Sequence, residues 1–121
     1  MIEADIIETL TDSEAVDGLV EGRVYALTRP QEDPLPAIVW QRISTVPQNS
    51  LNGFSGLDEV RIQFSCYAET LLQAKELAAA MRSALNGNSE LKSTCVMEMD
   101  DQDPETRNFR VLVDFNFWQR G

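Results

Sequence analysis

The chain has 121 residues, of which 43% are hydrophobic and 25% charged, and its 20 acidic and 10 basic side chains give a formal net charge of −10. A chain of this length can bury roughly two-thirds of its unfolded surface, so one folded domain over residues 1–121 is expected and global disorder is excluded. Nucleic-acid backbones and anionic membrane surfaces are bound through clustered cations. With only Lys75, Lys92 and scattered arginines, the chain is not expected to bind either.

The first third of the chain predicts two short helices and a short strand. Apolar residues recur at helical spacing within residues 2–10, which favours a first helix. Thr11 and Glu14 have the spacing of a capping box, so a second helix is expected to begin after Thr11. Residues 23–27 predict a short strand, and the three prolines of 28–36 indicate an irregular loop.

The middle of the chain predicts two strands with a loop between them. Residues 37–46 are rich in β-branched and aromatic side chains, and Pro47 is expected to end this strand. Residues 57–67 alternate apolar and polar side chains, which is typical of a strand buried on one face. The intervening residues 47–56 are too many for a tight turn and are expected to form a loop, mobile in the free subunit, of a length that is often functional.

Three residues of this loop are the candidate contacts with another subunit or partner: Leu51, Asn52 and Phe54. Leu51 and Phe54 are apolar side chains among Asn, Ser and Gly, and such isolated apolar anchors are common at binding surfaces. The alternative is that both side chains fold back over an edge of the sheet.

The last part of the chain predicts a long helix followed by a hairpin. Thr70 begins a second capping box, and apolar residues at helical spacing continue to a stop at Gly87. Residues 91–99 predict a strand with Cys95, Met97 and Met99 on one face, and the alternation of residues 109–117 is the strongest strand signal in the chain. Both cysteines are expected to be buried free thiols, with a disulfide as the alternative.

The element order helix-helix-strand-strand-strand-helix-strand-strand predicts an α+β fold. We expect a mostly antiparallel sheet of four to five strands, with a central helix packed on one face and short N-terminal helices. No membrane span or secretory signal is visible in the sequence, so a reducing cytoplasm is the expected place of synthesis.

The sequence predicts no catalytic residue, no metal site and no cofactor, so the protein is not expected to be an enzyme. Histidine is absent and the six glycines stand apart, which removes His-dependent nucleophile pairs and phosphate-binding loops. The acidic stretch around 101–105 has Thr106 and Leu112 where a calcium loop needs Gly and Glu. A carboxylate-dependent enzyme remains as a minor alternative, because many acids are present.

Several strings of the chain resemble the tail completion (head-to-tail joining, or tail terminator) proteins of long-tailed bacteriophages and prophages. The resemblance covers essentially the whole chain and includes the aromatic final strand. Its other segments are residues 22–25 (GRVY), 35–44 (LPAIVWQRIS), 56–64 (GLDEVRIQF), 81–87 (MRSALNG) and 103–106 (DPET).

This resemblance implies a structural subunit that is assembled in the bacterial cytoplasm and forms a hexameric ring in the virion tail. The ring would close the head-proximal end of the tail tube, so the implied partners are copies of this chain, the tail tube protein and the head connector protein. Acidic side chains could then line a channel that repels DNA, and the candidates are Asp100, Asp101, Asp103 and Glu105, with the acids of residues 3–21 as a second set. Solvated surface charge and another small α+β protein-interaction module are the alternatives.

Overall fold

A computed structural model of the chain describes residues 2–28, 34–50, 53–88, 92–104 and 107–120, and for residues 46–50, 53–57 and 119–120 it describes the backbone alone. The described residues form three helices and five strands. The helices are α1 (Ile2–Asp12), α2 (Glu14–Val20) and α3 (Leu71–Gly87). The strands are β1 (Val24–Ala26), β2 (Ala37–Ser50), β3 (Gly53–Ala68), β4 (Lys92–Gln102) and β5 (Phe109–Arg120).

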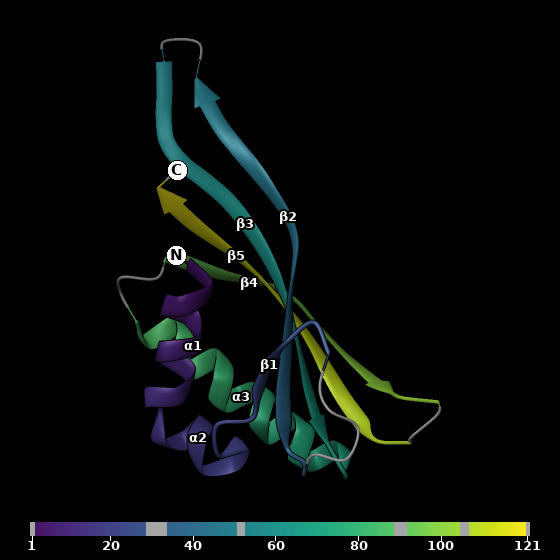
Figure 1. The fold of residues 1–121 in the computed structure, drawn as a ribbon. Coiled ribbons are helices and arrows are strands. Elements are labelled where there is room, and N and C mark those ends of the chain that lie inside the picture. Colours follow the sequence, from purple (N-terminus) through teal and green to yellow (C-terminus); the bar gives the residue numbers. More distant parts are fainter. Residues whose placement is uncertain (1, 29–33, 51–52, 89–91, 105–106, 121) are drawn as a thin grey trace.

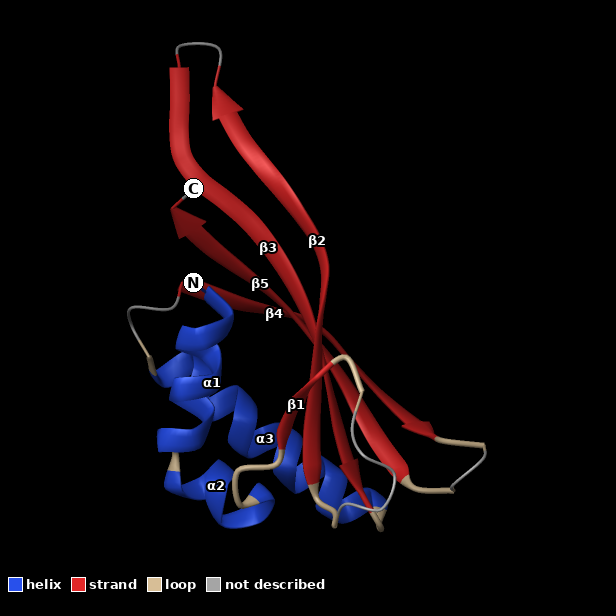
Figure 2. Ribbon diagram, in the orientation of Figure 1, coloured by secondary structure: helices blue, strands red, loops and turns tan. Residues whose placement is uncertain are grey.

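The strands form one sheet in the order β1-β2-β3-β5-β4, and all three helices lie on one of its faces (Figure 1; Figure 2). The short β1 pairs with β2 in parallel, whereas the pairs β2–β3, β3–β5 and β4–β5 are antiparallel. The predicted α+β class, with a mostly antiparallel sheet and a helix packed on one face, is therefore confirmed.

The core lies between the helices and the sheet, and it follows directly from the alternation of the strands. Every second residue of β3 and β5 points to the helices, including Phe64, Phe115 and Phe117, all fully buried. The ring centroids of these three phenylalanines are 5.7–6.3 Å apart, a spacing at which aromatic pairs stabilise a core beyond simple burial. The helices contribute the buried residues Ile2, Ile6, Leu10, Val16, Val20, Ala74, Leu77, Ala78, Met81 and Leu85.

One predicted helix cap is confirmed and the other is wrong. Thr70 caps α3, where its hydroxyl accepts a hydrogen bond from the Gln73 amide at 3.2 Å. Thr11 does not cap α2: it lies inside α1 and its hydroxyl donates to the Ile7 carbonyl at 2.9 Å. Ser13 caps α2 instead, with extended backbone angles that a cap needs and a helical residue cannot have.

The predicted loop at residues 47–56 is also wrong, because β2 and β3 continue as a long hairpin that projects beyond the rest of the sheet (Figure 1). Pro47 does not end β2 but pairs with Asp58, and Ser50 pairs with Gly53. A proline lacks the N–H needed in the middle of a sheet, yet it is tolerated on an edge. Since β1 pairs only with residues 38–40 of β2, Pro47 lies on such an edge.

A bulge in β4 corrects the expectation that Cys95, Met97 and Met99 share one face. Cys95 pairs with Phe115 and Met97 pairs with Asp114, so Val96 is an extra residue without a partner on β5. An extra residue reverses the alternation of the side chains that follow. Cys95 therefore packs against the core, whereas Met97 and Met99 are exposed on the face away from the helices.

Candidate interaction surfaces

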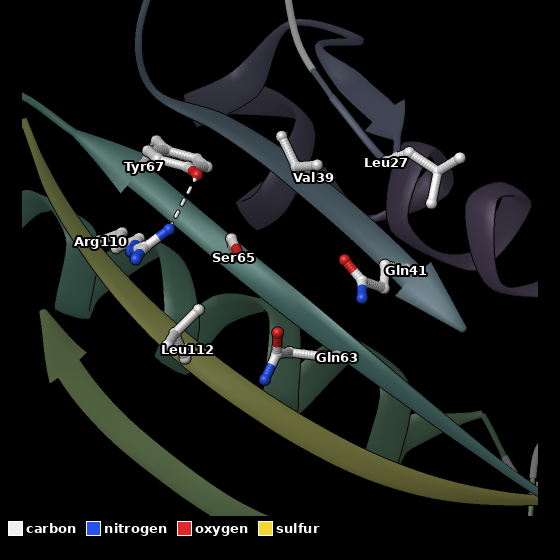
Figure 3. A pocket seen from close by; sticks show the side chains of 8 residues that line it. All are labelled: Leu27, Val39, Gln41, Gln63, Ser65, Tyr67, Arg110 and Leu112. Atoms are coloured by element: carbon white, nitrogen blue, oxygen red, sulfur yellow. Dashed lines mark hydrogen bonds between the residues drawn. The ribbon is translucent and has the colours of Figure 1, made fainter. Parts of the chain in front are cut away.

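The sheet face away from the helices carries a small, partly open hollow near β1. It measures ≈ 200 Å³ (Figure 3), below the roughly 300 Å³ at which pockets for drug-sized ligands begin. Neither a carboxylate nor a thiol lines it, so it offers no acid-base pair for catalysis. The lining residues come from β2, β3, β5 and the residue that follows β1: Leu27, Val39, Gln41, Gln63, Ser65, Tyr67, Arg110 and Leu112.

The cation at one end of this hollow, Arg110, already has partners within the subunit. Its Nε donates to Asp101 Oδ2 at 2.6 Å and its Nη1 to the Tyr67 hydroxyl at 3.3 Å, as Figure 3 shows for Tyr67. The hydrogen bond from Arg110 is the main reason that the pKa of Asp101 lies below its usual range. Desolvation opposes the charge of Arg110, but hydrogen bonds to Tyr67 and Asp101 outweigh it and raise the pKa of the guanidinium. Arg110 is therefore not a vacant anion site.

A second ion pair on the same face contains the one charged side chain that is buried among the described residues. Asp114 on β5 is 4% exposed, and its Oδ2 lies 2.8 Å from Arg61 Nη2 on β3. Asp114 Oδ1 is buried without a hydrogen-bond partner among the described residues. The sequence analysis did not single out this pair, although opposite charges on the polar faces of two alternating strands were the signal for it.

The predicted acidic channel lining is divided between the two faces of β4. Asp100 points to the helices and pairs with Lys75 Nζ on α3 at 2.9 Å, whereas Asp101 points away from them and pairs with Arg110. Asp103 forms the turn after β4, with backbone bonds to Asn108 and Arg107. Glu105 lies outside the described residues, and a lining role for any of the four stays a prediction.

The predicted subunit contacts at the hairpin tip also stay predictions. Leu51 and Asn52 lie outside the described residues. For Phe54 the structure describes the backbone, which pairs with Asn49.

The sequence analysis missed a set of exposed apolar residues along the outer parts of the sheet. Val96, Met97 and Met99 are exposed on β4, and Ile43 is exposed on β2. Ile43, like Val96, is the extra residue of a bulge, because Arg42 pairs with Ile62 and Ser44 pairs with Arg61. Sequence alternation does not reveal a bulge, so the exposure of these residues could not be predicted from it.

Both cysteines are free thiols, as expected, but only Cys66 is fully buried. Its Sγ lies 3.9 Å from Met81 Sδ in the core, and burial raises the pKa of this thiol far above its usual value. Within the described ranges, no group of three or more His, Cys, Asp or Glu side chains is placed to hold a metal ion. The helices of the described part are too short or too polar to cross a membrane.

The fold is similar to that of a chain from a gene transfer agent virion and to that of a bacteriophage protein. One chain of the virion of a native gene transfer agent particle superposes with a TM-score of 0.73 at 17% identity, covering 96% of this chain and 92% of the other. The gp17 protein of bacteriophage SPP1 superposes with a TM-score of 0.61 at 15% identity, covering 96% and 86% of the two chains. At these identities the likeness establishes the fold. No curated protein matches the sequence.

The sequence itself matches a known family over almost its whole length. The family described as "Tail completion protein gp17" matches residues 4–120. This range contains all five strands and, apart from the first two residues of α1, all three helices. The resemblance inferred from sequence strings is thus confirmed by an independent comparison, and this chain belongs to the tail completion protein gp17 family of phage structural proteins.

Proposed function

We propose that this chain closes the head-proximal end of a phage-type tail tube as a ring of identical subunits and joins the tail to the head connector. The observation that carries the proposal is the family match over residues 4–120. The fold shared with a chain of a gene transfer agent virion supports it, because that chain too is part of a virion.

The surface of the subunit suits assembly better than catalysis. The hollow beside β1 contains no carboxylate, so this hollow gives no support to the alternative of a carboxylate-dependent enzyme. The projecting β2–β3 hairpin has β5 as a further neighbour only up to the pair Leu57–Arg120. Isolated two-stranded ribbons are marginally stable in water, so contacts of Leu51, Asn52 and Phe54 with a tail tube protein or another copy would stabilise the tip.

The acidic helices are better candidates for a DNA-repelling surface than β4. Helices α1 and α2 have no basic residue, and Asp5, Glu8, Asp12 and Glu14 are exposed there. Asp100 and Asp101, in contrast, are partly neutralised by Lys75 and Arg110. A lumen that carries the helix acids would repel phosphates within a Debye length of about 8 Å and leave DNA free to pass.

Deletion of the gene for this chain tests the proposal. Particle-producing cells without it should accumulate free heads and free tails, and electron microscopy should find tail ends that lack the terminal ring. Expression of the chain from a plasmid should restore joined particles. Joined particles with capped tails in the deletion strain would refute the proposed function.

A further inference from the structure

We propose that neighbouring copies join by pairing the two outer edges of the sheet, so that β4 of one copy lies antiparallel to residues 41–46 of β2 in the next. The inference rests on the proposed ring and assigns its subunit contact. It is carried by four features of the described residues: unpaired edges, strand direction, exposed apolar side chains and charge.

Both edges are free to pair within the described part of the chain. β4 forms its ladder with β5 alone, and β1 covers β2 only at residues 38–40. Beyond Trp40, β2 has β3 on one side and no described strand on the other. An unpaired edge presents N–H and C=O groups that another strand can bind. Because Pro47 has no N–H to donate to a neighbouring strand, the proposed pairing segment ends at residue 46.

The strand directions fit a head-to-tail contact between copies in the same orientation. β2, β3, β5 and β4 alternate in direction, because each neighbouring pair is antiparallel. β2 and β4 therefore run in opposite directions, as Figure 1 also shows. When identical copies stand side by side, β4 of one meets β2 of the next in the antiparallel sense. Repetition of such a heterologous contact closes a ring when the rotation permits.

Each edge also carries exposed apolar surface that the subunit itself leaves uncovered. The bulge residues Ile43 and Val96 are 44% and 45% exposed, and Met97 and Met99 continue the apolar strip on β4. Burial of these four side chains between copies would stabilise the contact by removing apolar area from water.

Charge selects the β2 edge of the next copy over a second β4 edge. β4 carries Glu98, Asp100 and Asp101, whereas residues 41–45 contain the cation Arg42 and no carboxylate. These carboxylates are partly neutralised by Arg82, Lys75 and Arg110 of the same subunit, but a two-fold dimer through β4 would still set the acids of one copy against those of the other, which is unfavourable in a strand pair. Pairing with β2 sets no carboxylate of residues 41–45 against them, and the one cation there, Arg42, also pairs with Glu3 of its own subunit.

Site-directed cross-linking on assembled tails tests the contact. In a Cys95→Ser background, Ile43→Cys and Val96→Cys are introduced together, and a short bifunctional maleimide is added to complemented tails and to concentrated purified protein. Cys66 is fully buried and stays unreactive. We expect a ladder of covalent oligomers that ends at the closed ring. A mixture of the two single variants should give dimers only, each with one chain of either type.

The matched control is Leu72→Cys, which places a thiol at an exposed apolar position on α3, away from both edges. It should give no ladder when combined with Val96→Cys. Dimers from Val96→Cys alone would reveal the two-fold pairing and overturn the proposal. Rings visible by microscopy without a ladder in either sample would overturn the edge contact and leave the proposed function intact. Failure of the function itself would appear as joined particles in the deletion strain.

Discussion

Strands β4 and β5 are neighbours in one hairpin, yet they differ strongly in burial. Most side chains described on β5 are buried, whereas those of β4 are exposed or only half-buried. In β5, Val111 to Phe115 and Phe117 are all buried, including the charged Asp114. In β4, no residue is buried, and Cys95 is the one that packs against the core. β5 lies between β3 and β4 beneath α3, whereas β4 has a strand neighbour on one side only.

This difference separates the part of the sheet that stabilises the subunit from the part that we propose binds a neighbouring copy. When a strand has neighbours on both sides and a helix above it, its apolar side chains become exposed to water only when the whole domain unfolds. An edge strand held by one ladder and by exposed ion pairs can exchange its outer contacts without loss of the core. Substitutions on the two strands should therefore differ in size and in the property that they change.

The largest effect is expected for Phe115→Ala on β5. Phe115 is fully buried and packs against both Phe64 and Phe117, so its truncation should lower the free energy of unfolding by about 3–5 kcal/mol. Urea unfolding measures the change. The matched substitution on β4, Met99→Ala, should change it by no more than about 0.5 kcal/mol, and similar losses for the two variants would contradict the comparison.

A smaller effect is expected at the ion pair that β5 makes with β3. Arg61→Met leaves the buried Asp114 carboxylate without its cation and should cost roughly 2–3 kcal/mol. Asp114→Asn should cost only about 1 kcal/mol, because Arg61 is 37% exposed and can be solvated. Urea unfolding of the two single variants and of the double variant gives the coupling free energy between Arg61 and Asp114. Equal losses of stability in the two single variants would show that Asp114 is not desolvated as the structure describes.

The ion pairs between β4 and α3 should contribute still less. Arg82 Nη1 lies 3.3 Å from Glu98 Oε1, and both side chains are partly exposed. Glu98→Gln should lower stability by no more than about 1 kcal/mol, and less at high salt. Unfolding at low and at high ionic strength measures this. A large, salt-independent loss would mean that β4 is part of the core.

Thiol labelling compares an inner and an outer strand without any substitution. Cys66 on β3 is fully buried, and Cys95 on β4 is only partly so. Cys95 should react at least about tenfold faster in the folded protein, because local opening of an edge needs less free energy than global unfolding. Mass spectrometry of peptides after a timed alkylation measures both rates, and equal rates would refute the assigned difference.

The raised pKa of Cys66 also predicts a pH dependence. The unfolded thiol ionises near pH about 8.5, whereas the folded one stays protonated. The unfolded state therefore loses a proton at alkaline pH, so stability should fall as the pH rises above that value. Cys66→Ala should show a shallower fall in urea unfolding between neutral and alkaline pH. An unchanged slope would exclude this contribution.

The sequence by itself determined the helix–sheet class, the alternating core of β3 and β5, and the cap of α3 at Thr70. Each depends on a periodicity or spacing within one segment, which side-chain burial and local hydrogen bonding impose wherever the segment lies. The strings that resemble tail completion proteins are local in the same sense, and the family match over residues 4–120 confirms what they indicated.

Only the tertiary structure decided the features that depend on neighbours. Whether Pro47 ends a strand depends on whether a second strand lies beside it, and here β1 stops short of it. Whether Met97 and Met99 face the core depends on a bulge that forms between two strands. Whether Asp100 and Asp101 act together depends on the cations that other elements bring to each face. These outcomes depend on contacts between segments that are distant in the sequence, and the periodicity of a single segment does not predict such contacts.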